Sequence, residues 1–261
     1  MTRMEPGIRV WPVVWLLVVL CACQQTAQPG SPTPPAPLAS QTPVTLTADP
    51  YVALREHMVT FDIEERGVLD AEVRRAMRAV PRHEFVPADY TDMAYADRPL
   101  PIGYGQTISQ PYIVAAMTEL LRLKRGDRIL EIGTGSGYQA AILAELTDEV
   151  YSVEIVEALY ERATDTLQRL GYHQVRTRHA DGYYGWEEHA PYDAIIVTCA
   201  PDHIPQPLIN QLKDGGRLVI PVGPPGSYQT LWLIEKQAEK VVSKQIMGVV
   251  FVPLTGEHPS P

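Results

Sequence analysis

Apolar and polar positions alternate with two different periods along most of the chain. Short apolar runs predict strands, and apolar residues spaced three and four apart between them predict helices. The strands are expected at 128–132, 150–154, 175–179, 193–198 and 217–222. The helices are expected at 138–146, 156–170 and 205–212, and another begins at Pro111, where a proline loses no helical hydrogen bond. Such alternation predicts a parallel sheet covered on both faces.

The flanks of this region follow other patterns. Two helical patterns, at 51–65 and 70–79, come first, and the stretch 80–108, rich in Pro, Gly and aromatic residues, is expected to be irregular. The tail, at 229–236 and 241–252, predicts extra strands that form an antiparallel edge. Residues 51–261 are therefore expected to form one α/β domain. Its sheet is doubly wound, mostly parallel and Rossmann-like, with extra N-terminal helices and C-terminal strands.

Residues 1–22 have the pattern of an export signal. Arg3 and Arg9 accompany an apolar run, 10–22, which is shorter than the roughly 20 residues that span a bilayer but suits a signal-peptide core. The sequence Leu20-Cys21-Ala22-Cys23 resembles a bacterial lipobox. It predicts cleavage before Cys23, lipidation of Cys23 and attachment of the protein to a membrane. A plain secretory signal or an uncleaved anchor would explain the same pattern.

The stretch 23–50 is expected to be a proline-rich linker. Residues 24–50 contain seven prolines, no aromatic residue and one charged residue, Asp49. Such a composition buries too little apolar surface to offset the entropy lost on ordering. The N-terminal region therefore predicts an exported protein, held by a lipid in the periplasm or cell envelope.

Charge and cysteine content narrow the classes of partner. The chain has 31 acidic and 22 basic side chains, a net charge of −9, whereas phosphate backbones bind clustered Lys and Arg. The three cysteines cannot build a disulfide framework, and the seven histidines show no close metal-ligand spacing. We therefore expect neither a nucleic acid partner nor a metal.

A glycine-rich turn follows the strand at 128–132. Gly133, Gly135 and Gly137, with Thr134 among them, would let the backbone turn tightly and approach a ligand. Glu154 ends the next strand, at a spacing that lets an acid bind the ribose hydroxyls of an adenosine ligand. Asp181-Gly182 follows the third strand, where it could address an adenine amino group. The set predicts an adenosine-binding site.

The spacing of the glycines favours one adenosine ligand over another. Dinucleotide sites use G-x-G-x-x-G, whereas these glycines stand at alternate positions, with Glu131 two residues before the first. This pattern resembles the S-adenosylmethionine site of class I methyltransferases, and a nicotinamide cofactor is the weaker choice. No triphosphate-binding loop of the form G-x-x-x-x-G-K-[ST] is present in the sequence.

The irregular stretch contains a distinctive segment, Pro101-Ile102-Gly103-Tyr104-Gly105-Gln106-Thr107-Ile108-Ser109-Gln110-Pro111. This segment closely resembles the protein-L-isoaspartate O-methyltransferases, and the resemblance covers essentially all of 51–261. Further matching segments are 81–87, 117–146, 181–182, 191–198, 215–218 and 252–255. The signal and the linker depart from the pattern, since familiar family members are compact cytosolic enzymes. A cytoplasmic location is thus the alternative to export.

The resemblance implies methyl transfer from S-adenosylmethionine to the free carboxylate of L-isoaspartyl, and also D-aspartyl, residues in damaged proteins, whose repair then proceeds through a succinimide. It further implies that Ser109 is the catalytic residue that orients the carboxylate. Ser109 could instead, or also, cap the helix that begins near Pro111. By the same resemblance Gln106, Thr107 and Ile108 contact the cofactor or substrate, and Thr255 closes over the cofactor.

Two other functions are compatible with the sequence. One is methylation of a small-molecule carboxylate or hydroxyl with the same cofactor. The other is a non-catalytic envelope lipoprotein that keeps the fold as a binding module. Because damaged proteins are large acceptors that need open access, we expect a monomer.

Overall fold

A seven-stranded sheet organises the part of the chain that the computed structural model describes, residues 49–238 and 240–257. Its order is β5-β4-β3-β6-β7-β8-β9, and β5 through β7 run parallel. The strands are β3 (Arg128–Ile132), β4 (Glu149–Glu154), β5 (Val175–His179), β6 (Tyr192–Val197), β7 (Leu212–Val222), β8 (Gln229–Gln237) and β9 (Lys240–Val249). The chain runs from β3 to β4 and β5 on one side and then crosses to β6 and β7 on the other side of β3, so the carboxyl ends of β3 and β6 flank a topological switch point.

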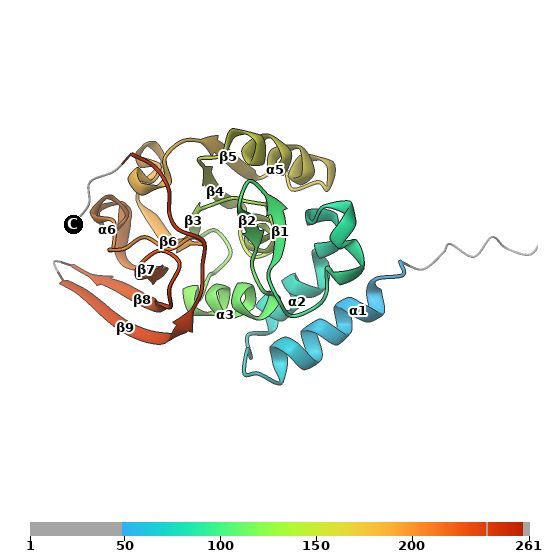
Figure 1. Ribbon diagram of the computed structural model, residues 1–261. Coiled ribbons are helices and arrows are strands. Elements are labelled where there is room, and N and C mark those ends of the chain that lie inside the picture. Colours follow the sequence, from blue (N-terminus) through green and yellow to red (C-terminus); the bar gives the residue numbers. More distant parts are fainter. Residues whose placement is uncertain (1–48, 239, 258–261) are drawn as a thin grey trace, which may run out of the picture. The chain divides into compact units, whose positions relative to one another are not determined.

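Helices cover both faces of this sheet (Figure 1). They are α3 (Pro111–Leu121), α4 (Tyr138–Ala144), α5 (Glu157–Arg169) and α6 (Gln206–Gln211). Alternate strand residues point to opposite faces. One set packs against α3 and α4 and comprises Ile129, Val150, Ala194, Ile196 and Val219. The other set packs against α6 and includes Leu130, Val153, Ile195, Val197 and Leu218. The prediction of a doubly wound α/β sheet is confirmed.

The tail adds the antiparallel edge that the sequence predicts. β8 pairs antiparallel with β7 and with β9, and both lie on the side of the sheet away from β4 and β5 (Figure 1). β7 begins at Leu212, five residues before the predicted strand. Gly215 and Gly216 lie inside this extension and break its apolar pattern, which explains why the periodicity places the start too late.

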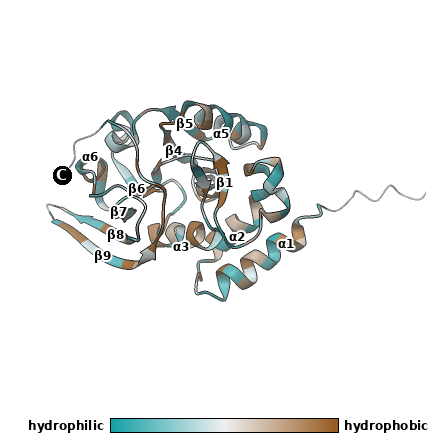
Figure 2. Ribbon diagram, viewed as in Figure 1, coloured by the Kyte–Doolittle hydropathy of each residue, from teal (hydrophilic) through white to brown (hydrophobic). Residues whose placement is uncertain are grey.

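The N-terminal elements form a separate layer beside the sheet. Helix α1 (Val52–His57) continues as a π-helical segment, Met58–Glu64, and α2 (Ala71–Ala79) follows. Two 3-10 turns, Arg82–Phe85 and Ala88–Met93, come next. In Figure 2, α1 and α3 both carry a mixture of hydrophobic and hydrophilic residues. Most residues of α3 are buried, whereas α1 has none that is.

The prediction that 80–108 is wholly irregular is wrong. This stretch contains an antiparallel hairpin of β1 (Leu100–Gly103) and β2 (Gln106–Ile108). Its turn places Gly103, Tyr104 and Gly105 at φ values of +90°, +55° and +73°. Strands of four and three residues are too short to give a readable alternation, so sequence periodicity could not reveal them.

The predictions for the N-terminal region fall on residues that the structure does not describe. The signal, Cys23 and nearly all of the linker lie outside the described residues. Within the described part of the chain, no helix is long and apolar enough to cross a membrane.

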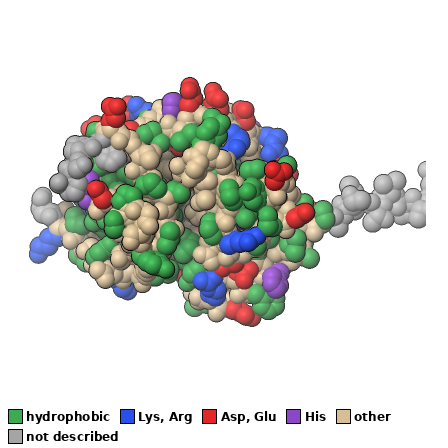
Figure 3. Space-filling model, viewed as in Figure 1, with side chains coloured by type: hydrophobic (Ala, Val, Ile, Leu, Met, Phe, Trp, Pro, Cys, Tyr) green, Lys and Arg blue, Asp and Glu red, His purple; other side chains and the backbone are tan. Residues whose placement is uncertain are grey.

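On the face seen in Figure 3, acidic and basic side chains are interspersed among apolar ones.

Candidate functional site

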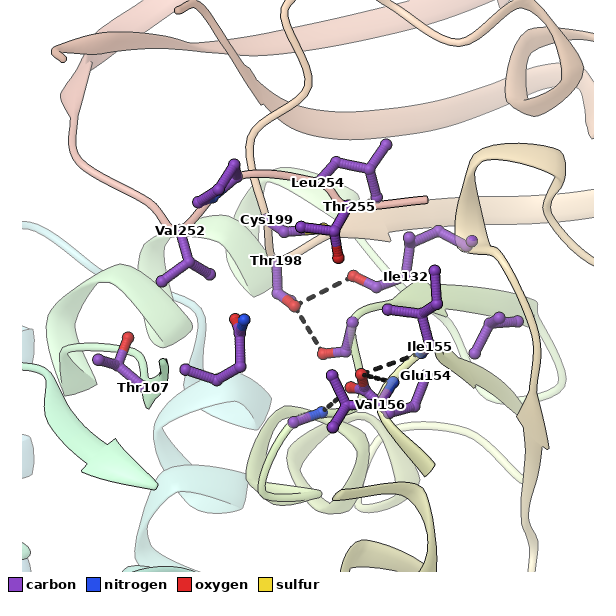
Figure 4. Close-up of a pocket in the computed structure, with 16 residues that line it drawn as sticks. Thr107, Ile132, Glu154, Ile155, Val156, Thr198, Cys199, Val252, Leu254 and Thr255 are labelled. Carbon is purple, nitrogen blue, oxygen red and sulfur yellow. Dashed lines mark hydrogen bonds between the residues drawn. The ribbon is translucent and has the colours of Figure 1, made fainter. Parts of the chain in front are cut away.

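A pocket opens at the carboxyl ends of β3, β4 and β6, at the switch point of the sheet (Figure 4). We call it the glycine-loop pocket. Its lining residues are Gln106, Thr107, Ile132, Gly133, Gly135, Val153, Glu154, Ile155, Val156, Gly182, Thr198, Cys199, Val252, Pro253, Leu254 and Thr255. This edge is where open α/β sheets bind their ligands.

The glycine turn forms the floor of this pocket. Gly133 and Gly135 have φ values of +95° and +55°, which side-chain-bearing residues rarely adopt. A Cβ atom at Gly133 would lie 2.6 Å from Thr198 Oγ1. That hydroxyl donates hydrogen bonds to the carbonyl oxygens of Ile132 (3.0 Å) and Gly133 (2.7 Å), as Figure 4 shows. Thr198 therefore fixes the backbone that a ligand would approach.

Glu154 faces the turn from the end of β4. Its Oε2 accepts a hydrogen bond from Gly135 N (2.7 Å), and its Oε1 accepts from Ile155 N (3.0 Å) and Val156 N (2.9 Å). A carboxylate has about four lone-pair sites, and these three bonds take three of them, so Glu154 can hold the loop and still accept from one ribose hydroxyl. A glycine floor with an adjacent acid fits the adenosine part of S-adenosylmethionine.

A buried polar network lies beneath this floor. Glu131 is fully buried and accepts a hydrogen bond from Ser152, whose hydroxyl also contacts Thr134 Oγ1 at 2.6 Å. Burial, together with the charge of Glu154, raises the pKa of Glu131 to about 8. Its Oε1 has no hydrogen-bond partner among the described residues. The carboxyl group of Glu131 therefore carries a proton at neutral pH.

Replacing Glu131 by glutamine is expected to remove a pH dependence of stability. Between 4.5, the ordinary pKa of a glutamate, which we take for the unfolded chain, and about 8, the folded state binds a proton that the unfolded state lacks. Stability should therefore fall as pH rises through this window, by at most about 1.4 kcal/mol per pH unit. Glu131→Gln does not titrate, so it should gain on the wild type between pH 5 and 8. Urea unfolding at several pH values measures this gain.

Glu157→Gln is the matched control, because Glu157 is exposed at the start of α5. Its stability difference from the wild type should stay constant over the same pH range. A constant difference for Glu131→Gln as well would contradict the raised pKa.

A second pocket adjoins the first and contains Ser109. We call it the Ser109 pocket. Its lining residues are Pro99, Thr107, Ser109, Gln110, Ile113, Thr198, Tyr228, Gly248, Val249, Val250, Phe251 and Val252. Thr107, Thr198 and Val252 line both pockets, so ligands in the two pockets would meet there. None of the residues lining this second pocket carries a charged side chain.

Ser109 does not cap the helix that follows it, so that reading is wrong. Gln110 occupies the N-cap position of α3 and makes no side-chain cap bond. The cap comes from a distant residue instead, because Asp97 Oδ1 accepts a hydrogen bond from Tyr112 N at 2.9 Å. Gln110 Nε2 donates to Asp97 Oδ2 at 2.6 Å. The Ser109 hydroxyl is thus left for the pocket that it lines.

The structure brings most of the predicted cofactor residues together. Seven of them line the glycine-loop pocket, namely Gln106, Thr107, Gly133, Gly135, Glu154, Gly182 and Thr255. Four lie next to it: Ile108 and Thr134 are buried, Gly137 caps α4, and Asp181 Oδ1 accepts from Tyr183 N. A direct cofactor contact by these four stays a prediction. No group of His, Cys, Asp or Glu that could hold a metal ion lies among the described residues.

The segment 252–255 bounds the glycine-loop pocket on a third side, besides the glycine turn and Glu154. We call it the third wall, and sequence reasoning missed most of it. The segment 252–255 crosses over the pocket, where Leu254 N donates to Ala200 O (2.9 Å) and Ala200 N donates to Val252 O (2.8 Å). Of this segment only Thr255 was predicted. Thr198 and Cys199 were also missed as lining residues, although their place at the end of an apolar strand is the usual place for ligand contacts. Burial raises the pKa of the Cys199 thiol, so it stays an unreactive thiol.

Known proteins resemble this chain over most of its length. The model of the protein-L-isoaspartate(D-aspartate) O-methyltransferase family matches residues 53–259. Protein-L-isoaspartate O-methyltransferase 2 of Syntrophobacter fumaroxidans is 57% identical over 221 residues, 80% of this chain and 89% of that protein. Its namesake in Polaromonas is 60% identical over 194 residues, 74% of this chain and 92% of that protein.

Solved structures agree with these relatives. A protein-L-isoaspartate O-methyltransferase superposes with a TM-score of 0.72 at 32% identity, covering 77% of this chain and 66% of that chain. A Plasmodium falciparum protein described as a member of the same enzyme class, in complex with S-adenosyl-L-homocysteine, gives a TM-score of 0.67 at 26% identity. That match covers 78% of this chain and 98% of the other. This chain therefore belongs to the protein-L-isoaspartate(D-aspartate) O-methyltransferase family.

Proposed function

We propose that this chain methylates the free carboxylate of L-isoaspartyl, and of D-aspartyl, residues in damaged proteins, with S-adenosylmethionine as methyl donor. The methyl ester then closes to a succinimide, which starts repair. The observation that carries the proposal is the meeting of two pockets at Thr107, Thr198 and Val252. One pocket has the glycine floor and acid of an adenosine site, and the other contains Ser109 in an uncharged lining.

The glycine-loop pocket would hold the methyl donor. Gly133 and Gly135 let the ligand approach the backbone, and Glu154 would accept from a ribose hydroxyl. The segment 252–255 would cover the ligand from the other side. When bound, S-adenosylmethionine supplies a methyl group on a positively charged sulfur, which is a strong electrophile.

The residues of the Ser109 pocket would orient the acceptor. A carboxyl group with an ordinary pKa near 4 is ionised at pH 7, so the reaction needs no general base. Hydroxyl-bearing residues Ser109 and Thr107 line the pocket and can donate hydrogen bonds to a carboxylate. Apolar neighbours such as Ile113 and Phe251 exclude water and so strengthen these bonds. Catalysis then consists of alignment in a poorly hydrated site.

Two peptides that differ only in an aspartyl or isoaspartyl linkage test this proposal. The purified full chain and methyl-labelled S-adenosylmethionine should put base-labile label on the isoaspartyl peptide alone. Label on neither peptide would contradict the proposal and, if cofactor still binds, would favour a small-molecule acceptor or a binding role. Label on both would contradict the proposed selectivity.

We also propose that the protein is exported and works in the periplasm or envelope as a monomer, with its membrane attachment through lipidated Cys23. The support is the apolar run 10–22 followed by a lipobox-like sequence and a proline-rich stretch. Metabolic labelling with a fatty acid should mark the wild type and not Cys23→Ala. Recovery of the unlabelled full chain in the cytoplasm would contradict export, and sedimentation of the purified chain tests the monomer.

A further inference from the structure

A fully buried arginine lies behind the Ser109 pocket. Arg82 is 0% exposed, and its Nε donates to the carbonyl oxygen of Ala94 at 2.7 Å. Its Nη2 donates to the carbonyl oxygen of Ser109, also at 2.7 Å. The guanidinium lies over the Tyr138 ring, 4.8 Å from the ring centroid. The side chain therefore joins the protein core directly to the backbone of the residue that lines the pocket.

The charge of Arg82 is not neutralised by its direct partners. Both hydrogen bonds go to neutral carbonyl oxygens, and Nη1 has no partner among the described residues. Asp97 is the carboxylate that acts on it electrostatically, but the oxygens of Asp97 are hydrogen-bonded to Gln110, Tyr112 and Arg66. Burial lowers the pKa of Arg82 to about 10, so the side chain remains cationic at pH 7.

A buried cation with neutral partners is costly to a folded protein. The position of Arg82 behind the Ser109 pocket lets its charge act on an acceptor carboxylate in that pocket. The lining of the Ser109 pocket holds no charged side chain, so nothing in that lining offsets the negative charge of an acceptor carboxylate. A positive charge in a medium of low dielectric acts over longer distances than in water.

We infer that Arg82 is a positioning residue for methyl transfer. It fixes the Ser109 backbone through the carbonyl oxygen of that residue, and its charge favours the ionised acceptor from behind the pocket wall. It acts through Ser109 and does not touch the substrate. The inference rests on the proposed function, because it requires a carboxylate acceptor in the Ser109 pocket.

Three variants of the full chain test the inference. Arg82→Met removes the charge and the donors but fills similar space, and Arg82→Lys keeps the charge. Phe85→Leu is the matched control, because Phe85 is buried in the same core and packs edge-on to Tyr138, with ring centroids 5.6 Å apart. For each variant, kcat and KM for an isoaspartyl peptide, the Kd for S-adenosylhomocysteine and the Tm are measured. The Ki of the uncharged isoasparaginyl peptide as a competitive inhibitor is also measured.

Arg82→Met is expected to lower kcat/KM for the isoaspartyl peptide by about 10- to 100-fold, the range for a lost hydrogen bond to a charged group. The Kd for S-adenosylhomocysteine and the Ki of the isoasparaginyl peptide should stay within about twofold, since neither ligand places a carboxylate in the Ser109 pocket. Arg82→Lys should recover most of kcat/KM.

Three results would overturn the inference. They are an unchanged kcat/KM in Arg82→Met, an equal rise in the Ki of the uncharged peptide, and an equal loss in Phe85→Leu at the same fall in Tm. Failure of the wild type to methylate the isoaspartyl peptide is a different result. It would reject the proposed function itself, and the inference with it.

Discussion

Ser109→Ala is expected to lower kcat for methylation of an isoaspartyl peptide by about 10²–10³-fold, the usual cost of losing one positioned donor in an active site. Ser109 lines the Ser109 pocket, and this pocket shares Thr107, Thr198 and Val252 with the glycine-loop pocket. The hydroxyl would hold the acceptor carboxylate in line with the methyl donor. Because Ser109 does not line the glycine-loop pocket, the Kd for S-adenosylhomocysteine should change by less than about twofold.

Steady-state kinetics with the peptide and calorimetry with S-adenosylhomocysteine measure the two effects separately. Thr118→Val is the matched control, because it deletes a buried hydroxyl from α3 that bonds to Val114 O and Gln139 and lines neither pocket. Its kcat should stay close to the wild-type value. A full-speed Ser109→Ala enzyme would reject the assigned role of the hydroxyl.

Glu154→Ala is expected to raise the Kd for S-adenosylmethionine by about 100-fold. A charge-assisted hydrogen bond to a ribose hydroxyl would be lost, and such a bond contributes about 1.5–3 kcal/mol. The variant also loses the bond that ties Gly135 N to Oε2, so the glycine floor is held less firmly. Both losses act on cofactor binding, so a saturating cofactor concentration should restore most of kcat.

Isothermal titration with S-adenosylmethionine measures this affinity. Glu157→Ala removes the same charge three residues later, from an exposed site outside both pockets, and should leave the Kd unchanged. If the two variants weaken binding equally, the effect of Glu154 is one of net charge and the ribose contact is refuted.

The sequence pattern predicts the sheet because its strands are buried on both faces. Runs such as 128–132 and 192–197 are largely apolar, and glycine or proline lies close to their ends. The pattern does not predict the hairpin β1–β2. Its conformation depends on contacts with the core, where Leu100, Ile102 and Ile108 are buried, and less on its own periodicity. Contacts between distant segments leave no local signature.

The residues of the candidate site fall into the same two groups: those with a local sequence pattern and those placed only by contacts between distant segments. The glycine turn and Glu154 were predictable, because a ligand of this shape needs those residues at the ends of successive strands. Arg82 was not, although it stands in a segment that resembles the family. An arginine in a mixed polar sequence is ordinarily exposed, and only the fold reveals that this one is fully buried against Ser109. The third wall at 252–255 depends in the same way on a long-range bridge, Ala200 to Pro253.

The position of the third wall in the sequence determines when, during synthesis, the protein can enclose a ligand. The segment 252–255 follows every strand of the sheet in the sequence, yet Val252 belongs to both pockets. During synthesis, the residues of β3, β4 and the glycine turn are made before this segment exists. The chain cannot enclose a ligand until the segment has docked beside Ala200. Closure of the site therefore waits for the segment 252–255, and a chain made only as far as β9 would not hold the methyl donor in a finished pocket.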